Sequence, residues 1–131
     1  MLVAARAVSH PWRGTLGNLS SGEFFGSVAD LLCGLQPVFR VPLALSEHGV
    51  GTDNDEVRAR FIPAALVELK KAIDDGVPVK GYCHWSLIDN FEWIFGYKIH
   101  FGLHSVDRDT FARTAKSSAA AYSSIVKKNA I

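Results

Sequence analysis

The sequence predicts an α/β fold in which helices alternate with the strands of a parallel sheet. Patterns typical of helices and of buried strands alternate over residues 20–129, in the order helix, strand, helix, strand, helix. Both strand patterns are apolar on both faces, as in parallel strands that are covered on both sides. A helix between two such strands gives a right-handed crossover, so we expect the strands to pair in parallel.

The first helix is expected over residues 20–35. Ser20 or Ser21 can cap its amino end. Gly34 and Pro37 are expected to end it. Its apolar face consists of Phe24, Val28, Leu31, Leu32 and Leu35. Residues 1–18 show no periodic pattern, so we leave them unassigned, as either a loop or a stretch of sequence from an unnatural start.

The first strand is expected over residues 38–46, which are mostly apolar. Glu47 follows at its carboxyl end. Gly49 and Gly51 then allow a sharp turn, because glycine tolerates backbone conformations that other residues avoid. This arrangement places a carboxylate at the edge where α/β proteins build their sites.

The second helix is expected from the segment 52–56 to about residue 75. The segment offers a capping residue and acidic residues in the first turn. Pro63 is expected to kink the helix, and Gly76 is expected to end it. Asp74 and Asp75 oppose the helix dipole, which the sequence does not explain. The apolar stripe consists of Val57, Phe61, Ala65, Leu69 and Ile73.

The second strand is expected over residues 77–85, and a final helix over residues 117–129 with Ala121, Tyr122 and Ile125 facing inward. Between them runs a long loop that opens with the stretch WSLIDNFEW, residues 85–93. Two tryptophans bracketing a carboxylate suit a sugar, because the rings cover its C–H face and the carboxylate accepts hydroxyl donors.

The residue types alone leave several alternatives open. Glu47 is either a catalytic carboxylate or a solvated loop residue. Glu47 and Glu92 together could form the acid pair of a two-carboxylate glycosidase. Trp85 and Trp93 could bind a sugar or pack in the core. His10, His84, His100 and His104 are scattered, so no metal site is expected.

Two motifs resemble glycoside hydrolase family 1, which contains β-glucosidases and β-galactosidases. The stretch at residues 85–93 is similar to a signature near the carboxyl end of that family, and LSEHGV at residues 45–50 is similar to its nucleophile motif. The resemblance extends from about residue 41 to residue 131. Departures are local: Ser46, His48 and Ala115 stand where the family usually has threonine, asparagine and proline.

The resemblance implies a role for each candidate residue. Glu47 would be the nucleophile of a retaining β-glycosidase, which needs no cofactor. Trp85 and Trp93 would flank the sugar, Glu92 would bind glycone hydroxyls and Phe101 would line the pocket. Asp89, Asn90 and Ser86 would hold the loop by hydrogen bonds. The partner expected is a β-glucoside or related β-glycoside.

The resemblance also implies a fold: the last two βα units of a (β/α)8 barrel. A complete barrel needs about 200–250 residues, and this chain has 131. The Asn-Glu-Pro motif that carries the general acid/base in the family is absent. We therefore expect a carboxyl-terminal part of a barrel that needs the missing units, or self-association, for activity. The alternative is an inactive fragment or half-barrel module that binds sugar weakly.

The bulk composition excludes other classes of function. The net charge is +1, from 14 basic and 13 acidic residues without a basic stripe, so no nucleic-acid partner is expected. No apolar run approaches the ~18 residues of a membrane helix. Cys33 and Cys83 lack metal-ligand spacing and are expected to be free thiols. With a poor signal-peptide pattern at the start, these features lead us to expect a cytoplasmic location.

Overall fold

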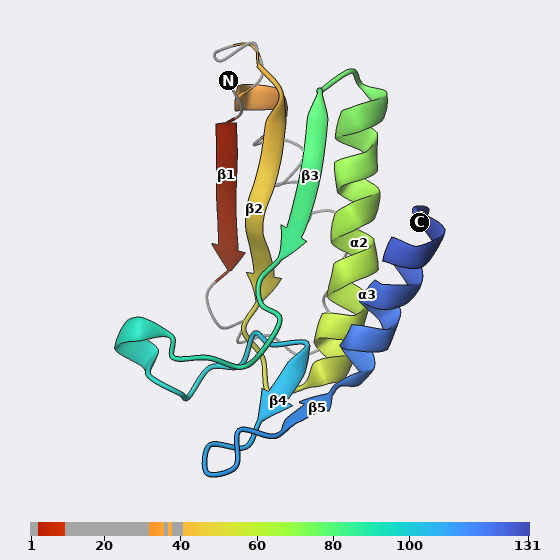
Figure 1. Cartoon of the computed structure of the whole chain (residues 1–131). Coiled ribbons are helices and arrows are strands. Elements are labelled where there is room, and N and C mark those ends of the chain that lie inside the picture. Colours follow the sequence, from red (N-terminus) through yellow and green to blue (C-terminus); the bar gives the residue numbers. More distant parts are fainter. Residues whose placement is uncertain (1–2, 10–31, 36, 38–40) are drawn as a thin grey trace.

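A three-stranded parallel sheet with two helices packed beside it forms the body of the molecule. The computed structural model describes residues 3–9, 32–35, 37 and 41–131. The sheet order is β1-β2-β3, and both pairings are parallel, which confirms the α/β prediction (Figure 1). The sheet and its helices are β1 (Val3–Ser9), β2 (Leu43–Val50), α2 (Asp55–Asp74), β3 (Val79–His84) and α3 (Ser117–Lys128).

The loop interpretation of residues 1–18 is wrong for Val3–Ser9, which forms β1 and pairs with β2 along its length. The segment VAARAVS is rich in alanine and lacks alternation, so it gives no local strand signal. Its conformation comes from pairing with β2, and such context outweighs intrinsic strand propensity. The rest of residues 1–18 lies outside the described residues.

The expected helix over residues 20–35 is described only at its end. Residues 32–35 and Pro37 are helical, so Gly34 does not end this helix. Residues 20–31 lie outside the described part of the chain. Leu32 is fully buried and joins the core, as its place on the apolar face predicts.

The boundaries of α2 follow the sequence signals closely. Asn54 is the N-cap, and its side chain accepts a hydrogen bond from the Glu56 N–H at 3.0 Å. Gly76 adopts φ +92°, and the N–H groups of Gly76 and Val77 donate to the carbonyls of Ile73 and Ala72, both at 3.0 Å. This pattern closes the carboxyl end of the helix.

The structure also explains how α2 accommodates Pro63 and Asp74. The helix continues through Pro63, so the proline does not break it. Asp74, which opposes the helix dipole, pairs with Lys70 at 2.7 Å one turn earlier. Both side chains are well exposed, so this pair contributes only a few tenths of a kcal/mol, about what helix ion pairs provide.

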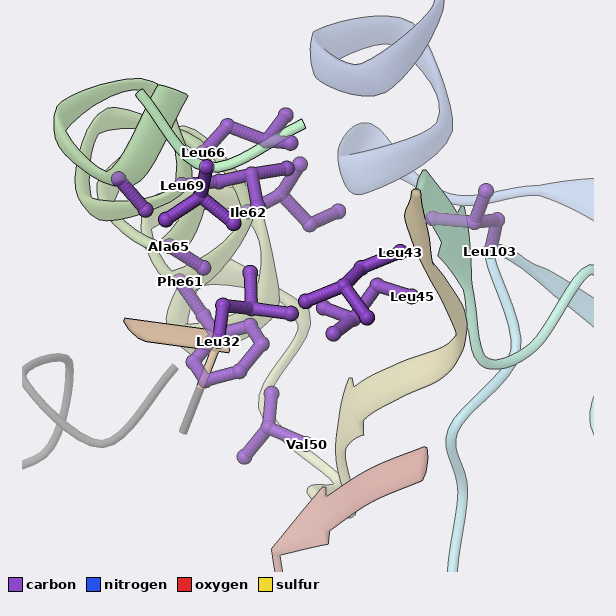
Figure 2. Packing of buried hydrophobic residues seen from close by; sticks show 12 residues of the cluster. Leu32, Leu43, Leu45, Val50, Phe61, Ile62, Ala65, Leu66, Leu69 and Leu103 are labelled. Atoms are coloured by element: carbon purple, nitrogen blue, oxygen red, sulfur yellow. The ribbon is translucent and has the colours of Figure 1, made fainter. Parts of the chain in front are cut away.

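The core lies between β2 and α2. Figure 2 shows Leu43 and Leu45 of β2 pointing toward the apolar side chains of α2. Four residues of the expected stripe on α2 are buried, whereas Ile73, in the last turn, is 45% exposed. The other buried members from α2 are Ile62, Leu66 and Ala72. From α3, Ala119, Tyr122 and Ile125 pack against this core, so Ala119 rather than the expected Ala121 takes the third position.

The loop between β3 and α3 contains more regular structure than expected. A short 3₁₀ helix, η2 (Trp93–Phe95), follows the WSLIDNFEW stretch. β4 (His104–Val106) and β5 (Arg113–Ala115) then pair antiparallel. Each strand has three residues, which is too short to give a period-2 signal in the sequence.

Asp55 joins α2 to α3. Its carboxylate accepts hydrogen bonds from the Ser117 hydroxyl and from both the hydroxyl and the N–H of Ser118, at 2.7–2.8 Å. The N-cap of α3, Lys116, makes no side-chain capping bond, so Asp55 supplies the cap from another helix. Partial burial works against the charge, but the bonds from Ser118, Ser117 and Arg58 outweigh it and lower the pKa of Asp55 to about 2.

Replacing Asp55 by asparagine is expected to loosen the amino end of α3. The change weakens several charge-assisted bonds, worth about 1.5–3 kcal/mol when made to charged groups. With the chain carried on a soluble fusion partner, amide hydrogen exchange in residues 117–128 should accelerate by at least about tenfold. Asp74→Asn, in the same helix but exposed, is the matched control. Equal exchange in both variants would contradict the assignment of Asp55 as the cap.

Candidate active site

Glu47 lies inside β2 rather than beyond it, at a bulge. On the β1 side, Leu45 pairs with Ala5 and Glu47 with Arg6, so Ser46 is skipped. On the β3 side, Leu45 pairs with Tyr82 and the next recorded pair is His48 with His84. Thus β2 carries one extra residue relative to both neighbours. The expected turn at Gly49 is therefore wrong, because β2 continues to Val50.

The bulge decides which way Glu47 points. In a regular strand, residues 43, 45 and 47 would share the face that packs on α2. Because of the extra residue, His48 rather than Glu47 takes the next position on the face that packs on α2. The His48 side chain is 6% exposed and stacks on Phe61 of α2, with ring centroids 5.0 Å apart. Glu47 is therefore turned away from the apolar core, and bulges beside active sites commonly re-aim a side chain in this way.

Trp85 and Glu92 come together next to the bulge. The Trp85 N–H donates to the His48 carbonyl at 2.9 Å, which ties the end of β3 to β2. The Trp85 indole donates to the Glu92 carboxylate at 3.2 Å. Glu92 is only 7% exposed. The Trp85–Ser86 peptide bond is cis. Two of the predicted sugar-binding residues are thus in direct contact.

Gly49 allows this close approach of the two strand ends. A Cβ atom at Gly49 would overlap the backbone carbonyl of Trp85. The contact is with backbone, which cannot move aside as a flexible side chain can. Glycine at this position is therefore required by the approach of the chain rather than by a turn.

The other two predicted sugar-binding residues lie differently. The Trp93 side chain is 78% exposed at the start of η2. Phe101 is 4% exposed, and its ring covers Gly51, where a Cβ would lie 2.9 Å from the ring. Phe101 thus packs against the strand end in this chain. A contact of either ring with a sugar stays a prediction.

Asp89 and Ser86 hold the loop around the site, as predicted, whereas the side-chain oxygen of Asn90 is buried without a hydrogen-bond partner among the described residues. The Asp89 carboxylate pairs with Lys116 at 2.8 Å and accepts the Gly102 N–H at 2.8 Å. The Ser86 hydroxyl donates to the Ile88 carbonyl at 2.8 Å. These bonds replace the sheet ladder that an irregular segment lacks.

A ring cluster behind the bulge was not predicted from the sequence. It consists of Phe61, His48, Tyr82, Tyr122 and His84, whose successive ring centroids are 5.0–6.3 Å apart. Burial lowers the pKa of His48 to about 4. Burial, followed by the charges of Arg58 and His48, lowers the pKa of His84 to about 4. Both rings are therefore neutral at pH 7.

Among the described residues, no group of three or more metal-ligating side chains gathers at one place. Cys33 and Cys83 are both exposed thiols, and neither forms a disulfide. The described helices also include none that is long and apolar enough to cross a membrane.

Comparison with known proteins identifies the family. The family model for glycosyl hydrolase family 1 matches residues 33–131. This chain belongs to glycosyl hydrolase family 1. Its last two parallel strands, with the helices that follow them, are therefore part of a (β/α)8 barrel, as the resemblance implied.

Curated relatives include β-glucosidases and β-galactosidases. The chain is 38% identical over 114 residues to β-glucosidase 47 of Arabidopsis thaliana, a match that covers 82% of this chain and 21% of the relative. It is 36% identical over 110 residues to a β-galactosidase of Sulfolobus acidocaldarius, covering 83% of this chain and 22% of the relative.

Solved structures of the family agree with the fold. A family 1 β-glucosidase from Thermotoga maritima superposes with a TM-score of 0.79 at 33% identity, covering 82% of this chain and 26% of that one. A β-glycosidase from Pyrococcus horikoshii gives a TM-score of 0.77 at 38% identity, covering 79% and 24%. The chain spans about a fifth to a quarter of the length of these relatives.

Replacing Gly49 by alanine is expected to separate the ends of β2 and β3. The added methyl group overlaps the Trp85 carbonyl, so the Trp85–His48 backbone bond must lengthen or break. Tryptophan fluorescence of the chain on a fusion partner without tryptophan should shift to longer wavelength. Gly81→Ala is the control, because nothing lies within 4 Å of a Cβ there. Identical spectra for both variants would refute the close approach.

The stability of the chain is expected to fall between pH 6.5 and about pH 4. Above pH 6.5 both histidines, His48 and His84, are neutral in the folded and in the unfolded chain. Below pH 6.5 the unfolded chain binds protons at these two positions, whereas the folded chain does not bind them until about pH 4. The unfolded state is therefore favoured as the pH falls through this range. A shift of this size corresponds to about 3 kcal/mol for the well-buried His48. The stabilisation from Asp55 is fully present above its unfolded pKa of 3.8 and is lost only below that pH, outside this window.

Urea unfolding followed by tryptophan fluorescence at pH 7 and pH 4.5 measures this effect on the same fusion protein. His48→Asn should reduce the acid loss, because one of the two buried imidazoles is gone. An unfolding free energy that is equal at both pH values in the unsubstituted chain would contradict the buried, neutral state of these rings.

Proposed function

We propose that this chain is the carboxyl-terminal part of a retaining β-glycosidase in which Glu47 is the nucleophile. One observation carries the proposal. The bulge in β2 turns the Glu47 carboxylate away from the core at the strand end where Trp85 and Glu92 meet. The Trp85 indole and the buried Glu92 carboxylate, in contact at the strand end that also carries Glu47, suit a sugar ring held near an attacking carboxylate.

In the proposed reaction Glu47 attacks the anomeric carbon and forms a glycosyl ester, which water then hydrolyses. A general acid/base protonates the leaving oxygen and later activates that water. The sequence holds no Asn-Glu-Pro motif, so this group comes from barrel units outside the chain. The reaction uses no cofactor.

Glu92 is better suited to hold the sugar than to act as the second catalytic carboxylate. Its Oε1 already accepts the Trp85 indole N–H, which fixes the carboxylate beside the ring that would cover the sugar. A fixed, ionised carboxylate forms strong hydrogen bonds to hydroxyl donors. We therefore assign Glu92, with Trp85, Trp93 and Phe101, to substrate binding in this proposal.

The substrate proposed is a β-glucoside or a closely related β-glycoside. The structures of the Thermotoga maritima relative include complexes with glucoimidazole and with deoxynojirimycin. Other relatives are named β-galactosidases, so the choice between glucose and galactose stays open. The exposed thiols of Cys33 and Cys83 suit a reducing compartment, which supports a cytoplasmic location.

The second candidate is an inactive fragment or half-barrel module with weak sugar binding. Large apolar side chains on the loop support it, because they are exposed in the described part of the chain and a partner would bury them. They are Leu87, Phe91, Trp93, Ile94 and Tyr97. Within the described residues β3 pairs with β2 alone, so its other edge is open. Activity thus requires the remaining barrel units or self-association.

A chimeric protein tests the two candidates. It joins residues 33–131 of this chain to the amino-terminal barrel units of the Thermotoga maritima β-glucosidase, and we call it the joined barrel. The 131-residue chain alone should not hydrolyse an aryl β-glucoside, whereas the joined barrel should. Glu47→Gln should lower its kcat by on the order of 10⁴ or more, as loss of a nucleophile does in other hydrolases.

Glu68→Gln is the matched control, since Glu68 lies on α2 and pairs with Lys71 there. Full activity of the Glu47→Gln barrel would refute the nucleophile assignment. Inactivity of the unsubstituted joined barrel, once its folding is verified by circular dichroism, would favour the inactive module.

A further inference from the structure

The hydrogen bond between Tyr82 and His48 lies directly behind the bulge that carries Glu47. His48 Nδ1 is 3.1 Å from the Tyr82 hydroxyl. The His48 ring is 6% exposed, stacked on Phe61 at 5.0 Å and met by the edge of Tyr82 at 5.7 Å. One polar contact thus orients a ring whose other described contacts are with the aromatic rings of Phe61 and Tyr82.

His48 also controls the backbone on both sides of the site. It follows Glu47 in the chain, and its carbonyl accepts the Trp85 N–H at 2.9 Å. His48 pairs with His84 across the β2–β3 ladder, and the pair before it is Leu45 with Tyr82. The two pairs are three residues apart on β2 and two residues apart on β3. The His48 side chain therefore anchors the stretch of β2 that carries the adjoining candidate nucleophile, Glu47.

We propose that Tyr82 and His48 act as a pair of positioning residues that hold Glu47 in its attacking orientation. This inference rests on the proposed function, since it names what sets the geometry of that site. Neither side chain is assigned a part in the reaction itself. Both act through the bulge, where the extra residue of β2 interrupts the regular ladder and leaves the strand dependent on such anchors.

The chemical state of the pair suits a fixed anchor. Burial lowers the pKa of His48 and raises the pKa of Tyr82, so the imidazole and the phenol both remain neutral over the neutral pH range. One group donates a single hydrogen and the other accepts it. Without the bond, a buried polar atom loses its partner, which costs more than an exposed bond does.

The experiment uses the joined barrel with Tyr82→Phe, with His48→Phe and with both. Each single change keeps an aromatic ring in the cluster and removes one side of the hydrogen bond. The rate of covalent labelling by a 2-deoxy-2-fluoro-β-glucosyl reagent, followed by intact mass, reports the attack step of Glu47 itself. Steady-state kcat and KM on an aryl β-glucoside separate attack from binding.

Each single variant should be labelled about tenfold more slowly or worse, since a displacement of about 1 Å in a reacting group costs up to about 10² in rate. KM should change by less than about threefold, because the Trp85–Glu92 pair is untouched. The double variant should lose no more than the worse single one, as expected for two halves of one interaction.

Tyr122→Phe is the matched control: it removes a hydroxyl from the same cluster, but its ring faces Tyr82 and His84 rather than His48. Equal losses in Tyr122→Phe and Tyr82→Phe would overturn the inference, because general packing of the cluster would then explain both. Labelling of Tyr82→Phe at the parent rate would also overturn it. If His48→Phe does not fold, Tyr82→Phe decides alone, since it removes a single oxygen atom.

The two proposals fail in different ways. If the unsubstituted joined barrel folds but is not labelled at Glu47, the proposed function fails, and the positioning role fails with it. If the parent is labelled and all variants match it, only the positioning role is lost.

Discussion

The extra residue in β2 is the constraint on which the site depends. A strand that packs on a helix must present apolar side chains at alternate positions, and Leu43 and Leu45 do so against α2. A carboxylate at the next alternate position would be buried in that core at a cost of several kcal/mol. The bulge resolves the conflict by giving His48 the buried position and Glu47 the opposite one.

Polar joints hold the irregular segments that surround this strand end. Arg58 is fully buried on α2 and donates to the carbonyls of Thr52 and His100, two residues that are also hydrogen-bonded to each other. Asp89, in the loop after β3, likewise holds an irregular segment in place: its carboxylate pairs with Lys116 and accepts the Gly102 N–H. Because loops lack a ladder, their backbone groups need such partners to keep one conformation. These charged groups therefore support the site without taking part in its chemistry.

The chain holds only part of what its relatives contain. Residues 33–131 match the family, yet the chain spans about a fifth to a quarter of its relatives. The parts it holds are those that the proposal assigns to the nucleophile and to one wall of the sugar site. The open edge of β3 and the apolar side chains of the loop mark where further barrel units would pack.

The sequence by itself determined the parallel α/β order, the caps of α2 and the family, because these depend on local patterns and on two long motifs. The same motifs supply the residues to which the proposal assigns the site. Only the tertiary structure decided that β1 is a strand, that β2 runs through Gly49 and that Glu47 faces away from α2. Each of these depends on contacts far apart in the chain: β1 with β2, Gly49 with the Trp85 carbonyl, and His48 with Tyr82, 34 residues later. A single-residue shift in strand register reverses every side chain, and no local pattern in this sequence marks the shift.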